Sequence, residues 1–136
     1  MNERPKNNLS ELPGKASIWS DEDGLSWLTF EQEAEISLED FLYLIECAKK
    51  TWIETEYFRV LVDLRTNPVI SAEARAFAAS PELQQYISCY AILANELSMK
   101  LVGNFFINFH KPEQPTKIFV DVEQARAWLL QQQQKR

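Results

Sequence analysis

Residues 60–78, VLVDLRTNPVISAEARAFA, contain a complete transition from strand to helix. The apolar run at 60–62 suits a strand that is covered on both faces. An irregular turn follows, and Ser71 precedes an alanine-rich segment of strong helix formers that ends at Ser80-Pro81. The stretch therefore predicts a buried central strand, an elbow and a helix.

The same alternation continues on both sides of this stretch. Apolar residues recur at helical spacing from Ser37 to Trp52, and strand patterns at 88–93 and 117–120 are each followed by a helix, which Asn95 and Asp121 are suited to cap. Two short strands at 16–20 and 25–30 flank Asp23-Gly24, a hairpin signal. The order β-β-α-β-α-β-α-β-α predicts an α/β fold with a mixed, largely parallel sheet and an N-terminal hairpin.

The chain of 136 residues suits one domain. We expect a flexible lead-in at 1–15, a single domain at 16–131 and a polar tail at 132–136. No apolar run reaches the roughly 18 residues of a membrane span, and the polar N-terminus lacks the apolar segment of a signal peptide. These features predict a cytoplasmic protein without a transmembrane segment.

The charge distribution argues against nucleic acid as a ligand. The formal net charge is −6, and residues 1–35 contribute most of it, with eight acidic and three basic side chains. The remainder is close to neutral and offers no basic face for a phosphate backbone. Cys47 and Cys89 lack metal-ligand or redox-motif spacing, so we expect two small buried thiols.

Ser71 has three interpretations. A helix N-cap needs no further assumption, because a serine oxygen accepts from the free amides of the first turn. Phosphorylation is chemically compatible with a helix N-terminus. A nucleophile would need an adjacent base, but the only histidine is His110, before a loop, and no GxSxG motif surrounds Ser71.

A second candidate site lies where the central strand ends. Arg65, Asn67 and Arg75, with Thr66, are candidates to bind an anion or an acidic side chain of a partner, because ligands often bind beyond the carboxyl ends of such strands. Asp63 belongs to the same group; an ion pair or turn-stabilising hydrogen bonds are the alternative for it.

The rest of the chain offers fewer candidates. The phenylalanine-rich face of Phe105, Phe106 and Phe109 either lines an apolar ligand cavity or belongs to the core. His110 with Glu113 or Asp121 falls short of a zinc ligand set, so no metal is expected. Only three glycines are present, and no phosphate-binding glycine motif occurs.

The element order and two segments resemble the SpoIIAA-like fold of STAS (anti-sigma-factor antagonist) domains and small bacterial proteins grouped as STAS/SEC14-like. These segments are residues 60–78 and the run 90–129, which includes Gly103-Asn104-Phe105-Phe106 and Ile118-Phe119-Val120-Asp121. In regulatory STAS proteins the elbow before the second helix carries a phosphorylatable serine or threonine in an Asp-Ser-Ser-Gly-like context. The resemblance implies Ser71, or else Thr66, for that position; Ile70 precedes Ser71 and Ala72 follows it.

These observations favour a non-enzymatic STAS-like protein-interaction or regulatory module, with an unidentified protein as partner and no cofactor. The alternative, which the SEC14-like resemblance implies, is a carrier of a small apolar or amphipathic ligand near Phe105, Phe106 and Phe109. A homodimer is a further expectation, based on a patch of exposed aromatic residues such as Trp19 or Trp52.

Overall fold

The computed structural model describes residues 7–52, 58–99 and 115–132. Its strands are β1 (Asn7–Leu12), β2 (Ala16–Ser20), β3 (Ser26–Phe30), β4 (Glu35–Ile36), β5 (Phe58–Asp63), β6 (Val69–Ile70), β7 (Ile87–Leu93) and β8 (Thr116–Phe119). Its helices are α1 (Leu38–Trp52), α2 (Ala72–Ala78), α3 (Pro81–Gln84) and α5 (Val122–Gln131), and residues 96–99 begin another helix.

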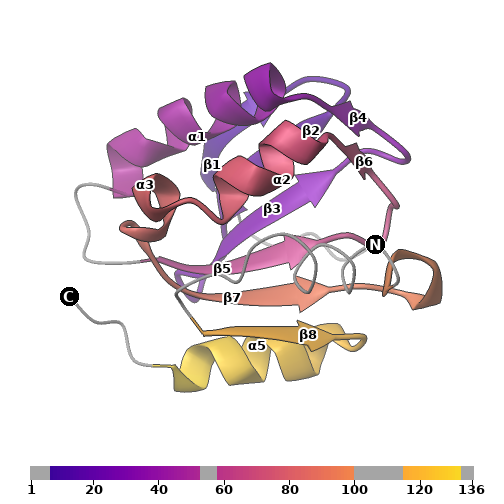
Figure 1. Ribbon diagram of the computed structural model, residues 1–136. Coiled ribbons are helices and arrows are strands. Elements are labelled where there is room, and N and C mark those ends of the chain that lie inside the picture. Colours follow the sequence, from indigo (N-terminus) through magenta and orange to yellow (C-terminus); the bar gives the residue numbers. More distant parts are fainter. Residues whose placement is uncertain (1–6, 53–57, 100–114, 133–136) are drawn as a thin grey trace.

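The main sheet has the strand order β1-β2-β3-β5-β7-β8 (Figure 1). β1, β2 and β3 pair antiparallel, whereas β3, β5, β7 and β8 run parallel. This arrangement confirms the predicted mixed, largely parallel sheet with an antiparallel hairpin at its beginning. The carboxyl ends of four parallel strands consequently meet at one edge of the sheet.

Residues 7–12, which the sequence analysis placed in the flexible lead-in, form the edge strand β1. Leu9 and Leu12 pack against the core, and two leucines are too few for a strand pattern to stand out in the sequence. The turn into β2 is closed by the Lys15 N–H donating to the Leu12 carbonyl at 3.0 Å. Gly14 takes a φ of 81° there, which favours glycine after a proline in such a turn.

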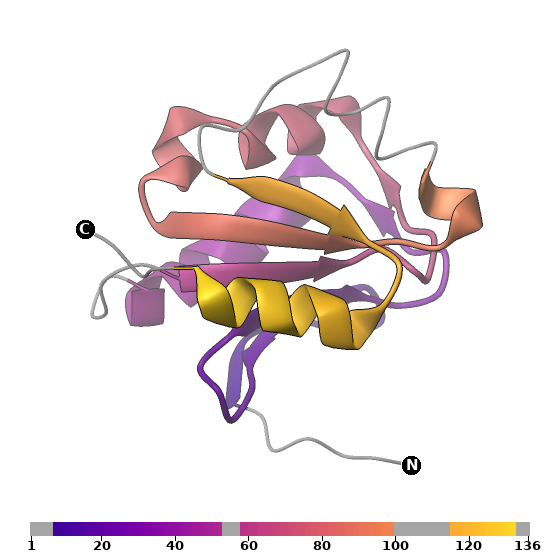
Figure 2. The same ribbon diagram turned by 90° about the horizontal axis from the view of Figure 1, so that it is seen from below.

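Helices cover both faces of the sheet (Figures 1 and 2). One face carries the larger core, in which α1, α2 and α3 pack against Val60 and other apolar strand residues. On the opposite face α5 packs Ala125 and Leu129 against Leu61 and its neighbours. The run 60–62 thus lies between two covered faces, as its continuous apolar character predicts.

A buried carboxylate fixes the β2–β3 hairpin and the position of α5. Asp21 Oδ1 accepts the backbone N–H groups of Asp23 and Leu25 at 2.9 and 3.0 Å, and Oδ2 accepts Trp27 Nε1–H at 2.9 Å. Arg126 of α5 donates to Asp21 at 3.4 Å and also pairs with Asp23. One side chain therefore joins the turn, the sheet and the last helix.

Besides β1, the predicted order lacks three short elements: β4, β6 and α3. β4 and β6 pair in parallel as a separate two-stranded sheet, with Glu35 opposite Val69 and Ile36 opposite Ile70. Each strand has two residues, which is too short for a periodic pattern. This small sheet leads directly into the N-termini of α1 and α2.

Candidate functional site

The elbow between β5 and α2 consists of the loop 63–71, which forms main-chain hydrogen bonds with the loop 31–36. In the loop 63–71, the Asn67 N–H donates to the Leu64 carbonyl at 3.0 Å. The loop 31–36 donates the Glu33 N–H to the Thr66 carbonyl at 2.9 Å and accepts the Val69 N–H on the Ala34 carbonyl at 2.8 Å. The elbow is therefore held by main-chain hydrogen bonds to the chain after β3.

Ser71 is the N-cap of α2. Its Oγ accepts the Ala74 N–H at 3.1 Å, and its own N–H donates to the Ile36 carbonyl at 3.0 Å. This geometry confirms the cap that the sequence suggested, because it satisfies a donor of the first turn. Phosphorylation of Ser71 stays a prediction.

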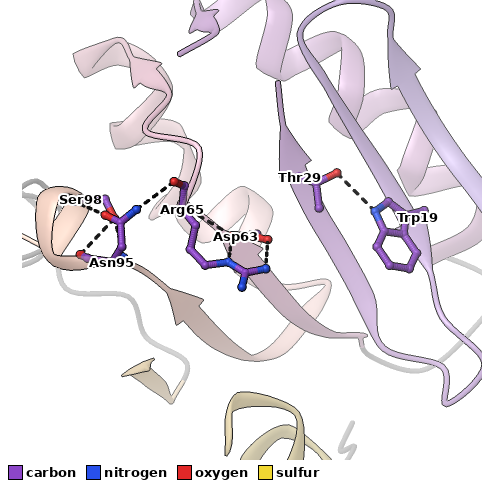
Figure 3. A network of polar contacts seen from close by, with 6 residues as sticks. All are labelled: Trp19, Thr29, Asp63, Arg65, Asn95 and Ser98. Carbon is purple, nitrogen blue, oxygen red and sulfur yellow. Dashed lines mark hydrogen bonds and ion pairs between the residues drawn. The ribbon is translucent and has the colours of Figure 1, made fainter. Parts of the chain in front are cut away.

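Asp63 and Arg65 form the ion pair that was the alternative interpretation of Asp63. The guanidinium donates from Nε at 3.0 Å and from Nη2 at 2.9 Å, and this pairing raises the pKa of Arg65 (Figure 3). The Arg65 carbonyl accepts from Asn95 Nδ2 at 2.9 Å, and Asn95 Oδ1 accepts the Ser98 N–H at 2.9 Å. Asn95 thus caps its helix as predicted and also fastens the elbow to the end of β7.

The remaining residues of the predicted anion or partner site lie close along the chain, two of them in the loop 63–71 and one in α2. Thr66 Oγ1 and Asn67 Oδ1 are buried, and neither has a hydrogen-bond partner within the described part of the protein. Arg75 lies one turn into α2, where its N–H donates to the Ser71 carbonyl at 3.0 Å. Since Asp63 neutralises Arg65, the loop does not present an isolated positive charge; anion binding stays a prediction.

Several side chains of the elbow and of the elements next to it are exposed, and we call them together the elbow face. Ile36 is buried and Ile70 packs against the core, so the alternation of a strand turns the residues before them, Glu35 and Val69, outward. Val69 is 59% exposed. We define the elbow face by its exposed residues on the loop 31–36, on β6 and in the first turns of α1 and α2. They are Val69 and five glutamates that form no ion pair among the described residues: Glu31, Glu33, Glu35, Glu39 and Glu73.

Several predicted features lie elsewhere. Phe105, Phe106, Phe109, His110 and Glu113 fall outside the described residues, so the apolar ligand cavity stays a prediction. Among the residues that the structure covers, no group of histidine, cysteine, aspartate and glutamate could hold a metal ion.

The two cysteines and the aromatic patch have different outcomes. Cys89 is buried, and burial raises the pKa of its thiol, whereas Cys47 is half-buried rather than buried as expected. Trp19 is only 7% exposed because it stacks on Trp27 with ring centroids 4.8 Å apart in the core beneath α5. It therefore cannot contribute to an exposed dimer patch, and the prediction of an exposed Trp19 was wrong.

Comparison with known proteins places this fold in a family. Residues 18–133 match DUF7793, described as a domain of unknown function. The chain belongs to the DUF7793 family. No curated protein matches this DUF7793 chain.

A solved structure extends the comparison to the fold. An uncharacterized protein of the DUF3478 family from Shewanella loihica PV-4, described as having a SpoIIAA-like fold, is 19% identical, with a TM-score of 0.56. The alignment covers 95% of the DUF7793 chain and 98% of the Shewanella protein. The SpoIIAA-like, STAS-like fold that the sequence suggested is thereby confirmed. No helix among the described residues of the chain is both long and apolar enough to cross a membrane.

Two contacts that position α5 have no signal in the sequence. Asp21 and Arg126 lie 105 residues apart, and only the assembled sheet brings them together. Arg59 donates from Nη1 to the carbonyls of Leu129 and Gln132 at 3.4 Å, at the end of α5. A cation at a helix C-terminus is favourable, but an arginine within a strand gives no signal of that partner.

Proposed function

We propose that the protein is a non-enzymatic, STAS-like interaction or regulatory module that binds a partner protein through the elbow face. The observation that carries this proposal is Val69, an exposed apolar side chain on a surface of glutamates that form no ion pair in the described chain. Apolar side chains desolvated at the centre of a contact supply much of its binding energy, and charges at the rim guide orientation. This surface favours a partner with complementary basic groups.

The role assigned to Ser71 agrees with a module that binds rather than catalyses. Its oxygen accepts from Ala74, as a cap requires, and Ile36 holds its backbone in place. A serine nucleophile needs a base within hydrogen-bond reach that can take its proton. The proposal therefore gives Ser71 a structural part in presenting the elbow face.

The test uses Val69→Arg, which replaces the exposed apolar side chain of the elbow face by a large positively charged group. Val120→Arg is the matched control, since Val120 is also exposed (67%) and follows β8, two strands away from β5 in the sheet. Both variants and the wild type serve as bait in extracts of the native host, and recovered proteins are quantified by mass spectrometry. We expect a partner that Val69→Arg loses and Val120→Arg retains.

Two results would contradict the proposal. A partner recovered equally well by both variants binds somewhere other than the elbow face. A partner lost by both variants would indicate a general effect of the added charge. Circular dichroism and melting temperatures of both variants distinguish such an effect from misfolding. Light scattering on the same samples tests the expected homodimer.

A further inference from the structure

Two loops of the elbow contain backbone conformations that ordinary side chains rarely adopt. Glu33 has a φ of 54° and Asn67 a φ of 57°. Asparagine tolerates the left-handed region, but glutamate gains nothing from it and is strained there. Glu33 lies in a turn closed by the Ala34 N–H donating to the Glu31 carbonyl at 3.1 Å, at the position that favours glycine.

The loop 63–71 also contains polar atoms whose hydrogen bonding is incomplete. Thr66 Oγ1 and Asn67 Oδ1 are both buried, and neither finds a partner among the residues that the structure describes. A buried oxygen that no donor of the protein reaches lacks a hydrogen bond that stabilises the folded chain. We call the conformation that the structure shows the closed form. In this form the side-chain oxygens of Thr66 and Asn67 therefore lack hydrogen bonds that would stabilise the loop 63–71.

The two loops cannot move independently. Glu33 donates its N–H to the Thr66 carbonyl at 2.9 Å, and Val69 and Ser71 donate theirs to the carbonyls of Ala34 and Ile36 at 2.8 and 3.0 Å. Displacing either loop breaks hydrogen bonds made by the other. Strain in one loop thus lowers the free energy needed to open both.

We propose that the loops 31–36 and 63–71 open and close as one unit, and that a partner at the elbow face captures the open form. The second half rests on the function proposed above. Only the open form exposes Thr66 Oγ1, Asn67 Oδ1 and the loop carbonyls to donors of a partner, so binding there supplies the hydrogen bonds that the closed form lacks. A ligand shifts such an equilibrium only through its differential affinity for the two forms.

Amide hydrogen exchange of the free protein, followed by NMR, tests whether the two loops open together. The reporters are amides whose hydrogen bonds lie within a single loop. The Ala34 N–H reports on 31–36, and the Asn67 N–H, which donates to Leu64, reports on 63–71. Thr66→Val replaces the unpaired hydroxyl by a group of the same shape, and Thr66→Ser is its control. We expect Thr66→Val, but not Thr66→Ser, to slow exchange of Ala34 in the other loop about five-fold.

The reciprocal perturbation is Glu33→Gly, which removes the left-handed strain, with Glu33→Ala as the control for lost charge. It should slow exchange of the Asn67 amide about five-fold relative to Glu33→Ala. Effects confined to the mutated loop would overturn the single unit. Faster exchange in Thr66→Val would also overturn the proposal. It would mean that the Thr66 hydroxyl has a hydrogen-bond partner, such as an ordered water, in the closed form.

Binding of the partner recovered with the wild-type bait then tests capture of the open form. Thr66→Val should weaken this binding by at least the factor by which it slows exchange, since the open form becomes rarer and the hydroxyl that the partner contacts there is removed. Unchanged affinity would overturn capture of the open form, whereas the function proposed above fails separately, through Val69→Arg.

Discussion

Replacing Asp21 by alanine is the sharpest test of how the hairpin and the last helix are held. The Asp21 side chain is fully buried and accepts four hydrogen bonds, from two backbone amides, the Trp27 indole and Arg126. Alanine keeps the backbone and removes both acceptor oxygens of the side chain. The perturbation therefore isolates one carboxylate.

The expected loss of stability can be worked out from the donors that lose their acceptor when the Asp21 carboxylate is removed. The bonds from the Leu25 amide and the Trp27 indole are buried, and a buried donor that loses its acceptor costs about 1–3 kcal/mol. Arg126 keeps its pair with Asp23, so its charge is not left alone. We expect Asp21→Ala to lower the free energy of unfolding by about 3–5 kcal/mol, out of roughly 5–15 kcal/mol for a domain.

Urea unfolding followed by circular dichroism and tryptophan fluorescence measures this loss. Asp23→Ala is the control, because Asp23 pairs with the same arginine but has a 44% exposed side chain, and such a pair contributes about 1 kcal/mol or less. Asp21→Asn keeps one acceptor oxygen and should fall between the two, which keeps the test informative if Asp21→Ala does not fold. A loss for Asp21→Ala no larger than that for Asp23→Ala would refute the reasoning.

Two further predictions concern the first turns of α2 and α1, where Ser71 caps α2 and where Asp40 of α1 accepts from Lys15 Nζ at 2.8 Å and from the Ser37 N–H at 3.1 Å. Ser71→Ala should lower the free energy of unfolding by about 1 kcal/mol, while Ser71→Asp, which also caps, should retain most of it; equal losses in urea unfolding would contradict the cap. The Lys15 ammonium, and next the Ser37 amide, lower the pKa of Asp40, so its stabilisation is complete above the unfolded pKa of about 3.9 and disappears as the pH falls through the lower folded value. Asp40→Asn should therefore flatten the decline of melting temperature between pH 4 and pH 2, by the equivalent of about 1 kcal/mol or less, and an unchanged decline would contradict the pairing.

The sequence predicted those elements whose signals are local. The run 60–62 indicated a strand buried on both faces, and Val60 and Leu61 indeed belong to the two opposite cores. Ser71 and Asp121 were identifiable as caps because the amides that they bind lie two or three residues away. Local chemistry was therefore enough for most of the element order.

Features that depend on distant partners were not predictable in this way. Trp19 looked exposed because nothing near it in the sequence shows that Trp27 stacks on it and that α5 covers the same face. The small β4–β6 sheet joins residues 34 apart through two residues on each strand. Its position nevertheless defines the elbow face, so the surface of greatest functional interest came from the structure.

The topology itself favours a binding surface over a small-molecule crevice at this edge of the sheet. Ligand crevices in open α/β sheets form where successive crossovers leave toward opposite faces. Here α1, between β3 and β5, and α2 and α3, between β5 and β7, all pack on the same face, so no such reversal separates these three strands. The loops 31–36 and 63–71 instead close the edge with main-chain hydrogen bonds and present Val69 outward. This arrangement supports the proposed contact with a partner protein, because such a contact needs an accessible surface and not an enclosing crevice.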